Sequence, residues 1–167
     1  MCIRKFYQCK RKAPAVVLAS VGNLAYIQRL HYHPPVYVEV PLMALYTLKV
    51  IADFASAHTL RDYPGACSRM HGHNWKVEAE VEANTLNSIG MAIDFKDIKR
   101  EVRAIAEELD HQYLNDLAPF QTINPTAEHI ARYFFQTLSQ RLNDERVRVC
   151  ALTIWETERA CVRYAEG

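Results

Sequence analysis

Three histidines have the spacing of a metal site. His71 and His73 lie one residue apart at the start of a segment in which apolar and polar residues alternate. The apolar members that follow are Trp75, Val77, Ala79 and Val81. In a β-strand, residues i and i+2 point to the same face, so both imidazoles are expected on the apolar side. His58 ends an earlier alternating segment, and we expect it to supply a third ring at the same place.

Three neutral imidazoles with one open position describe a catalytic zinc centre. Such ligands leave the ion its full positive charge, so that it can polarise a bound hydroxyl or carbonyl. Cys67 precedes His71 by four residues, and a nearby cation favours its thiolate form, so we expect Cys67 to transfer protons. Two alternatives stay open: Cys67 as the fourth ligand of a structural zinc, and three ordinary histidines at strand ends.

Asp110 and His111 fall where a predicted helix ends. A helix C-terminus and an adjacent carboxylate both favour a protonated imidazole. The pair is therefore either functional or a capping pair on the surface.

Glu156 shares a predicted strand face with apolar residues, namely Cys150, Leu152 and Ile154. Its carboxylate should point inward, and a buried lone carboxylate is costly. It therefore pairs either with an arginine such as Arg159 or with the two adjacent N–H donors of a guanidine-like heterocycle.

The apolar pattern predicts the elements that position these side chains. They are a strand over 45–58, a strand over 72–84, a helix capped by Asp94 and ending near Asp110 and His111, a helix capped by Thr126, and two strands joined by 157–159. The apolar stripe of the first helix is Phe95, Ile98, Val102, Ile105, Ala106 and Leu109. The order β-β-α-α-β-β predicts an α+β domain with two helices on one face of a four-stranded antiparallel sheet. The open sheet edges favour a homo-oligomer.

The composition sets the broad class of the chain. Its 167 residues are half hydrophobic with a net charge of +1, which suits one folded domain and gives no sign of a nucleic-acid or membrane partner. The five cysteines are scattered without a CxxC pair. They indicate a reducing compartment, and we expect a cytoplasmic protein.

The first 42 residues differ from the rest. They hold six lysines and arginines against one acidic residue, Glu39, whereas residues 43–167 hold fourteen against eighteen. The apolar stretch 15–21 is short and is interrupted by Gly22 and Asn23, which argues against a secretory signal. We expect 1–42 to be a disordered or loosely packed extension, or the product of a misread start with Met43 as initiator, and 43–167 to form the domain.

Five motifs, in this order along the chain, resemble the 6-pyruvoyltetrahydropterin synthase family. The resemblance is greatest to its bacterial branch, 6-carboxy-5,6,7,8-tetrahydropterin synthase of the queuosine pathway, and covers about residues 44–166. The motifs are Phe54-Ala-Ser-Ala-His58, Cys67-x-x-x-His71-Gly-His73-Asn74, Leu109-Asp110-His111, Asn124-Pro125-Thr126-Ala-Glu128 and Trp155-Glu156-Thr157. One departure is His129, where the family has asparagine.

The resemblance implies a role for each matching residue. It implies zinc ligands at His58, His71 and His73, and a general base at Cys67. It implies that Asp110 and His111 form a proton-relay pair contributed from a neighbouring subunit. It implies that Glu156 anchors the pterin ring and also takes part in the relay. It implies substrate-binding positions at Phe54, Thr126 and Glu128.

The fold implied is the tunnelling fold, whose units associate into a barrel, here a hexamer or another trimer-based assembly. The activity implied is that of a zinc-dependent lyase acting on 7,8-dihydroneopterin triphosphate. Zinc would hold the side-chain hydroxyls while the cysteine moves a proton as triphosphate leaves, and acetaldehyde is then released. The alternatives are 6-pyruvoyltetrahydropterin synthesis, a zinc-stabilised binding module, and a zinc hydrolase with Glu156 as its base.

Overall fold

The computed structural model describes residues 16–21, 24–29, 36–39 and 44–166, with side chains from residue 44 onward. The chain divides into two compact units, Met1–Met43 and Ala44–Gly167. In the first unit, an antiparallel sheet of order β1-β2-β3 is formed by β1 (Val16–Val21), β2 (Leu24–Arg29) and β3 (Val36–Glu39). The expected extension or misread start falls mostly on residues outside the described ranges, and it stays a prediction.

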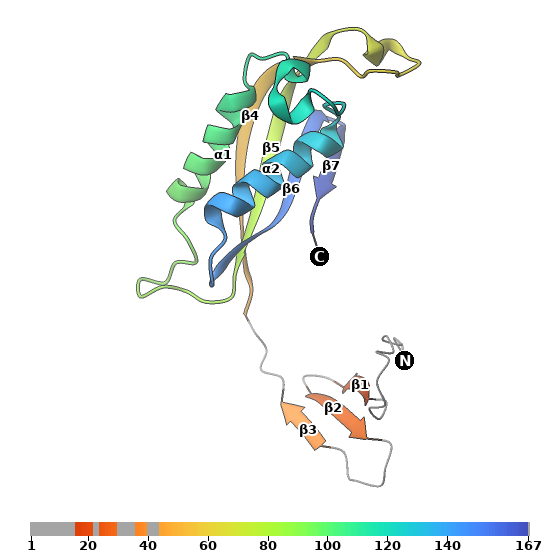
Figure 1. The fold of residues 1–167 in the computed structure, drawn as a ribbon. Helices are drawn as coiled ribbons and strands as arrows, with labels where there is room; N and C mark the ends of the chain where they lie inside the picture. The colour runs from red at the N-terminus through yellow and green to blue at the C-terminus, as the bar shows by residue number, and fades with distance from the viewer. Residues whose placement is uncertain (1–15, 22–23, 30–35, 40–43, 167) are drawn as a thin grey trace. The chain divides into compact units, whose positions relative to one another are not determined.

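The second unit is a four-stranded antiparallel sheet with both helices on one face (Figure 1). The strand order is β4-β5-β6-β7. The elements are β4 (Tyr46–His58), η1 (Ala66–Ser68), β5 (His71–Ala83), α1 (Phe95–Leu109), η2 (Leu114–Asp116), η3 (Ala118–Phe120), α2 (Ala127–Leu142), β6 (Val147–Thr157) and β7 (Ala160–Tyr164). The predicted β-β-α-α-β-β architecture is confirmed.

Both helices begin at the residues that the sequence predicts. The Asp94 side chain accepts a hydrogen bond from the Lys96 backbone N–H at 2.8 Å. The Thr126 hydroxyl accepts one from the His129 backbone N–H at 3.3 Å. Each cap satisfies a donor that the first helical turn leaves free.

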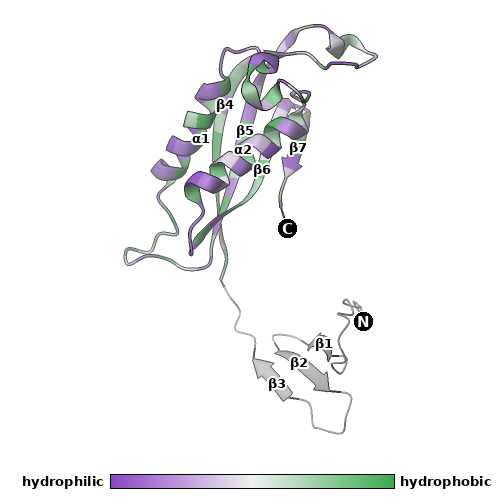
Figure 2. Cartoon of the chain, in the orientation of Figure 1, coloured by the Kyte–Doolittle hydropathy of each residue, from purple (hydrophilic) through white to green (hydrophobic). Residues whose placement is uncertain are grey.

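The core lies between the helices and the sheet. Apolar side chains at alternate positions of β4 and β5 are buried against the stripes of α1 and α2. Figure 2 shows hydrophilic residues on the outward faces of both helices. Phe95 differs from the prediction, because as the first residue of α1 it is 48% exposed and takes no part in the buried stripe.

A β-bulge changes which residues of β6 face the core. Glu80 pairs with Ala151 and Val81 pairs with Val149, so Cys150 is the extra residue. The Cys150 thiol approaches the Glu80 carbonyl oxygen at 3.4 Å. The prediction that Cys150 shares the core face of this strand is therefore wrong, since the bulge reverses the alternation at this point.

The helices are also joined at their surface. The Tyr133 hydroxyl donates to a Glu108 carboxylate oxygen, and the Arg141 guanidinium donates to the other, both at 2.8 Å. Burial and the Glu108 carboxylate raise the pKa of Tyr133 to about 12.

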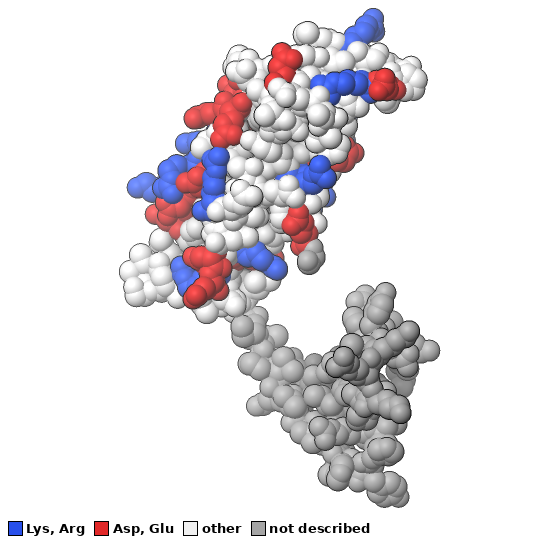
Figure 3. All heavy atoms as spheres, viewed as in Figure 1, with Lys and Arg blue, Asp and Glu red and all other residues white. Residues whose placement is uncertain are grey.

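Acidic and basic side chains are interspersed over the helical face of the second unit (Figure 3). Among the described residues, no helix has the length and apolar character needed to span a membrane.

Candidate metal centre

Strand pairing brings the three histidines together. His58, the last residue of β4, lies opposite His71, the first residue of β5, and His73 follows on the same face. Their ring centroids are 4.4–5.2 Å apart. One ligand nitrogen from each ring lies within 4.8 Å of the other two, so the cluster can hold a metal ion.

Two of the rings are oriented by backbone carbonyls. The Nδ1 atom of His58 lies 2.8 Å from the Pro125 carbonyl oxygen, and that of His71 lies 2.8 Å from the Arg69 carbonyl oxygen. A carbonyl oxygen only accepts, so Nδ1 carries the proton and the lone pair lies on Nε2. This arrangement is typical of histidines that bind a metal through Nε2.

The same region contains buried nitrogens without a hydrogen-bond partner. Among the described residues, two of them are the Nε2 atoms of His58 and His73, which can bind a metal, and a third is the Trp75 Nε1 donor beside them, which cannot. A buried polar atom without a partner is costly, and such atoms in folded proteins call for an explanation. A bound metal ion gives one, so the residues present fit a metal centre.

The environment keeps these rings neutral. Burial lowers the pKa of His58, against the opposing effect of its bond to the Pro125 carbonyl. Burial also lowers the pKa of His73, although the nearby Glu156 carboxylate acts in the opposite direction. Because a metal binds only the neutral imidazole, the lowered pKa values favour metal binding near neutral pH.

Glu156 lies beside the cluster. One carboxylate oxygen is 3.4 Å from His73 Nε2 and 3.8 Å from His58 Nε2. Within the described part of the chain, these two neutral imidazoles are the basic groups within 4.0 Å of the Glu156 carboxylate, and it forms no ion pair with Arg159. Its negative charge would stabilise a cation held by the rings.

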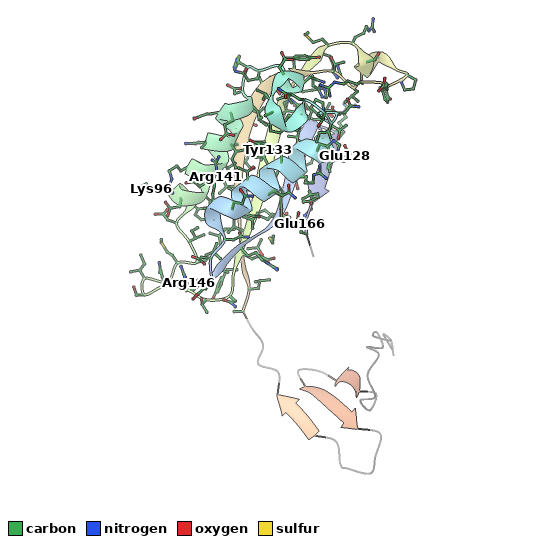
Figure 4. The ribbon with its side chains drawn as sticks, viewed as in Figure 1. Lys96, Glu128, Tyr133, Arg141, Arg146 and Glu166 are labelled. Carbon is green, nitrogen blue, oxygen red and sulfur yellow. The ribbon has the colours of Figure 1, made fainter. Side chains whose placement is uncertain are left out.

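A cavity of about 530 Å³ opens next to His58 and Glu156. Thr126, the N-cap of α2, also lines it, as does Glu128 in the first turn of that helix. Figure 4 labels Glu128. This volume lies within the range usual for small-molecule sites. The cavity therefore places a carboxylate and a helix N-terminus beside the histidine cluster.

Cys67 lies in η1, in the loop between β4 and β5, and is partly exposed. The Leu60 N–H donates to the Cys67 carbonyl at 2.9 Å and ties this loop back on itself. The nitrogens of the three histidines lie within 4.8 Å of one another, and the Cys67 sulfur does not belong to this group. The structure thus does not bring the thiol into the histidine cluster.

Asp110 and His111 lie together at the end of α1. The Asp110 carboxylate accepts from the Ala55 N–H at 2.7 Å and contacts His111 Nδ1 at 2.7 Å. These contacts lower the pKa of Asp110, and the hydrogen bond from the Ala55 N–H has the largest effect. His111 has a φ of 54° and a side chain that is 82% exposed. A second cavity, also about 530 Å³, is lined by both His111 and His73.

Phe54 is a core residue. Its ring packs between Trp75 and Phe134, with centroids 6.0 and 5.7 Å away, and only 4% of the residue is exposed. It is not among the residues that line the cavity beside the cluster. We assign Phe54 a packing role, and its contribution to substrate binding stays a prediction.

Comparison with known proteins agrees with this fold. A model of the family described as 6-pyruvoyl tetrahydropterin synthase matches residues 47–167, and the chain belongs to this family. The second unit accordingly has the tunnelling fold.

Three relatives illustrate the range of the family. The Haemophilus influenzae protein named 6-carboxy-5,6,7,8-tetrahydropterin synthase is 30% identical over an alignment of 138 residues, gaps included, that covers 68% of this chain and 94% of that protein. The Pyrococcus furiosus dihydroneopterin monophosphate aldolase is 30% identical over 105 residues, and the match covers 63% of this chain and 84% of that protein. The structure of Caenorhabditis elegans 6-pyruvoyl tetrahydropterin synthase matches with a TM-score of 0.68 and 25% identity, covering 75% of this chain and 98% of that one.

Proposed function

We propose that this protein is a zinc-dependent 6-carboxy-5,6,7,8-tetrahydropterin synthase of queuosine biosynthesis, acting in the cytoplasm. The reaction converts 7,8-dihydroneopterin triphosphate to the carboxy product and releases acetaldehyde and triphosphate. The observation that carries the proposal is the pair of buried Nε2 atoms on His58 and His73, which have no hydrogen-bond partner among the described residues, together with the ligand-sized cavity that His58 lines. The similarity to the Haemophilus influenzae protein supports the same activity.

His58, His71 and His73 would hold the zinc ion. When bound, zinc supplies a Lewis acid that polarises the side-chain hydroxyls of the substrate. Cys67 takes up the proton that is lost as triphosphate leaves. Its place outside the ligand cluster supports this role, because a thiol bound to the metal would not be free to accept a proton.

Glu156 anchors the pterin ring. Its carboxylate accepts two N–H donors from the guanidine-like edge of the ring through charge-assisted hydrogen bonds. Thr126 and Glu128 line the same cavity and would contact the substrate.

Asp110 and His111 complete the proton relay from a neighbouring subunit. The exposed side chain of His111 supports this arrangement, since it is available to the site of another copy. The open edges of the sheet, at β4 and β7, support assembly of the units into a trimer-based barrel.

The experiment is product analysis on the purified protein supplied with zinc and 7,8-dihydroneopterin triphosphate. Acetaldehyde and 6-carboxytetrahydropterin are the expected products, and His58→Ala serves as the control without the metal site. A second function, formation of 6-pyruvoyltetrahydropterin, is favoured by the likeness to the Caenorhabditis elegans structure. Triphosphate release without acetaldehyde would select that function, and an untouched substrate would contradict both.

A further inference from the structure

His129, near the start of α2, lies outside the metal cluster but close to the loop that supports it. Its Nδ1 atom is 2.7 Å from the Asn124 carbonyl oxygen. Because a carbonyl only accepts, the ring must donate, and Nδ1 carries the proton. The ring is partly buried, so this bond is shielded in part from water.

Asn124 is fixed at both its side chain and its backbone. Its side-chain oxygen accepts from the Arg61 N–H at 2.8 Å, and its side-chain nitrogen donates to the Arg61 carbonyl at 2.9 Å. Its own carbonyl also accepts from the Thr126 N–H at 2.8 Å. The His129 ring therefore adds a second donor to a carbonyl whose peptide leads directly into Pro125.

Pro125 is the residue that orients the first metal ligand. It is buried, and its carbonyl oxygen accepts from His58 Nδ1 at 2.8 Å. This hydrogen bond directs the lone pair of His58 Nε2 toward the cluster. Any rotation of the backbone at Asn124 and Pro125 would lengthen the bond and release the ring.

We propose that His129 is a positioning residue for the metal ligand His58. Its ring N–H holds the Asn124 carbonyl, and this keeps the following Pro125 carbonyl in place for His58. The inference rests on the metal-binding part of the proposed function and is independent of the pterin chemistry. An asparagine at position 129 offers an amide N–H that can serve the same carbonyl, whereas phenylalanine keeps the ring and removes the donor.

The test compares His129→Phe with His129→Asn, and uses Arg132→Ala, an exposed change one turn further along α2, as the matched control. The tautomer of His58 is measured by ¹⁵N NMR on the metal-free protein, and Zn²⁺ affinity is measured by competition with a chelator. We expect His129→Phe to reduce Zn²⁺ affinity about tenfold, the lower end of the range for loss of an outer-shell partner. It should also reduce the fraction of His58 protonated at Nδ1, while His129→Asn and Arg132→Ala keep both values.

The outcomes separate a positioning role from a structural one. A structural role alone would lower the melting temperature of His129→Phe while His58 keeps its tautomer, and this result overturns the inference. Equal losses in His129→Asn and His129→Phe also overturn it, because the donor would then be irrelevant. His129→Ala carries the same expectation if His129→Phe does not fold. A wild-type protein that binds no Zn²⁺ contradicts the proposed function, and the His58 tautomers still decide the role of His129.

Discussion

The histidine cluster and the turn that carries Asp110 and His111 are built in opposite ways. The cluster lies at the paired ends of two 13-residue strands, and His58 is 1% exposed with its ring fixed by a backbone carbonyl. The turn follows the end of α1, and His111 projects a largely exposed side chain from a residue with positive φ. The cluster is therefore organised within one chain. The turn presents the His111 ring outward while Asp110 is held by the Ala55 N–H, and in our proposal a second copy supplies the surface that completes the pair.

The largest effect is expected from His58→Ala. It removes one of three metal ligands, so metal affinity should fall by more than the roughly 10–100-fold that loss of an outer-shell partner costs. Turnover should be lost with the metal. Metal content of the purified variant, measured by mass spectrometry, checks this, and His111→Ala is the control that keeps full metal content. Equal metal content in wild type and His58→Ala would contradict the cluster as the binding site.

The next effect is expected from Cys67→Ala. The variant should keep its metal and lose turnover by roughly 10²–10⁴-fold, the usual contribution of a general base. Cys150→Ala is the matched control, because the Cys150 thiol contacts the Glu80 carbonyl on the opposite face of the sheet. Steady-state kinetics and metal analysis on both variants provide the measurement. Loss of metal from Cys67→Ala would show that the sulfur is a ligand and would refute the base assignment.

A mixing experiment tests whether the two regions belong to different copies. Cys67→Ala and His111→Ala should each be nearly inactive. Suppose that each site takes Cys67 from one chain and His111 from another. After random reassembly of an equal mixture of the two variants, about a quarter of the sites then contain both native side chains. Activity should therefore return after the variants are unfolded and refolded together. A mixture that stays inactive would place both residues in the same chain.

The sequence predicts the cluster well because its information is local. Period-2 alternation places His71 and His73 on one face, and the same pattern in the first strand places His58 there. The N-caps at Asp94 and Thr126 are local signals too, and both are confirmed.

Other features depend on contacts that no sequence pattern displays. The Pro125 and Arg69 carbonyls that orient the rings belong to backbone groups that every residue carries. The bulge at Cys150 arises from pairing between β5 and β6, so alternation along one strand could not reveal it. The double hydrogen bond between Asn124 and Arg61 joins residues 63 positions apart.

The smallest effect concerns the pH dependence of the free energy of unfolding. The histidine cluster and the Asp110 turn should lose their contributions in different pH ranges. Burial lowers the pKa values of His58 and His73 below the ordinary 6.5, so just below that pH the unfolded chain binds more protons than the folded one. The stability of the metal-free protein should be complete above about pH 6.5 and should fall as the pH drops below it. The pKa of Asp110 is lowered from 3.8, so its contribution is present above that value and is lost only in stronger acid.

Urea unfolding of the metal-free protein across this pH range provides the measurement. Asp110→Asn should alter the curve only in the acid part and leave the part near pH 6.5 unchanged. A metal-free protein that becomes more stable between about pH 7 and pH 5.5 would contradict neutral, buried rings at the cluster.

The most direct test of the metal centre is X-ray absorption at the zinc edge on the zinc-loaded protein. Three imidazole nitrogens at about 2.0–2.1 Å are expected, with the remaining position filled by oxygen and no sulfur in the shell. A sulfur neighbour at about 2.3 Å would make Cys67 a fourth ligand and the site structural, and it would contradict the account.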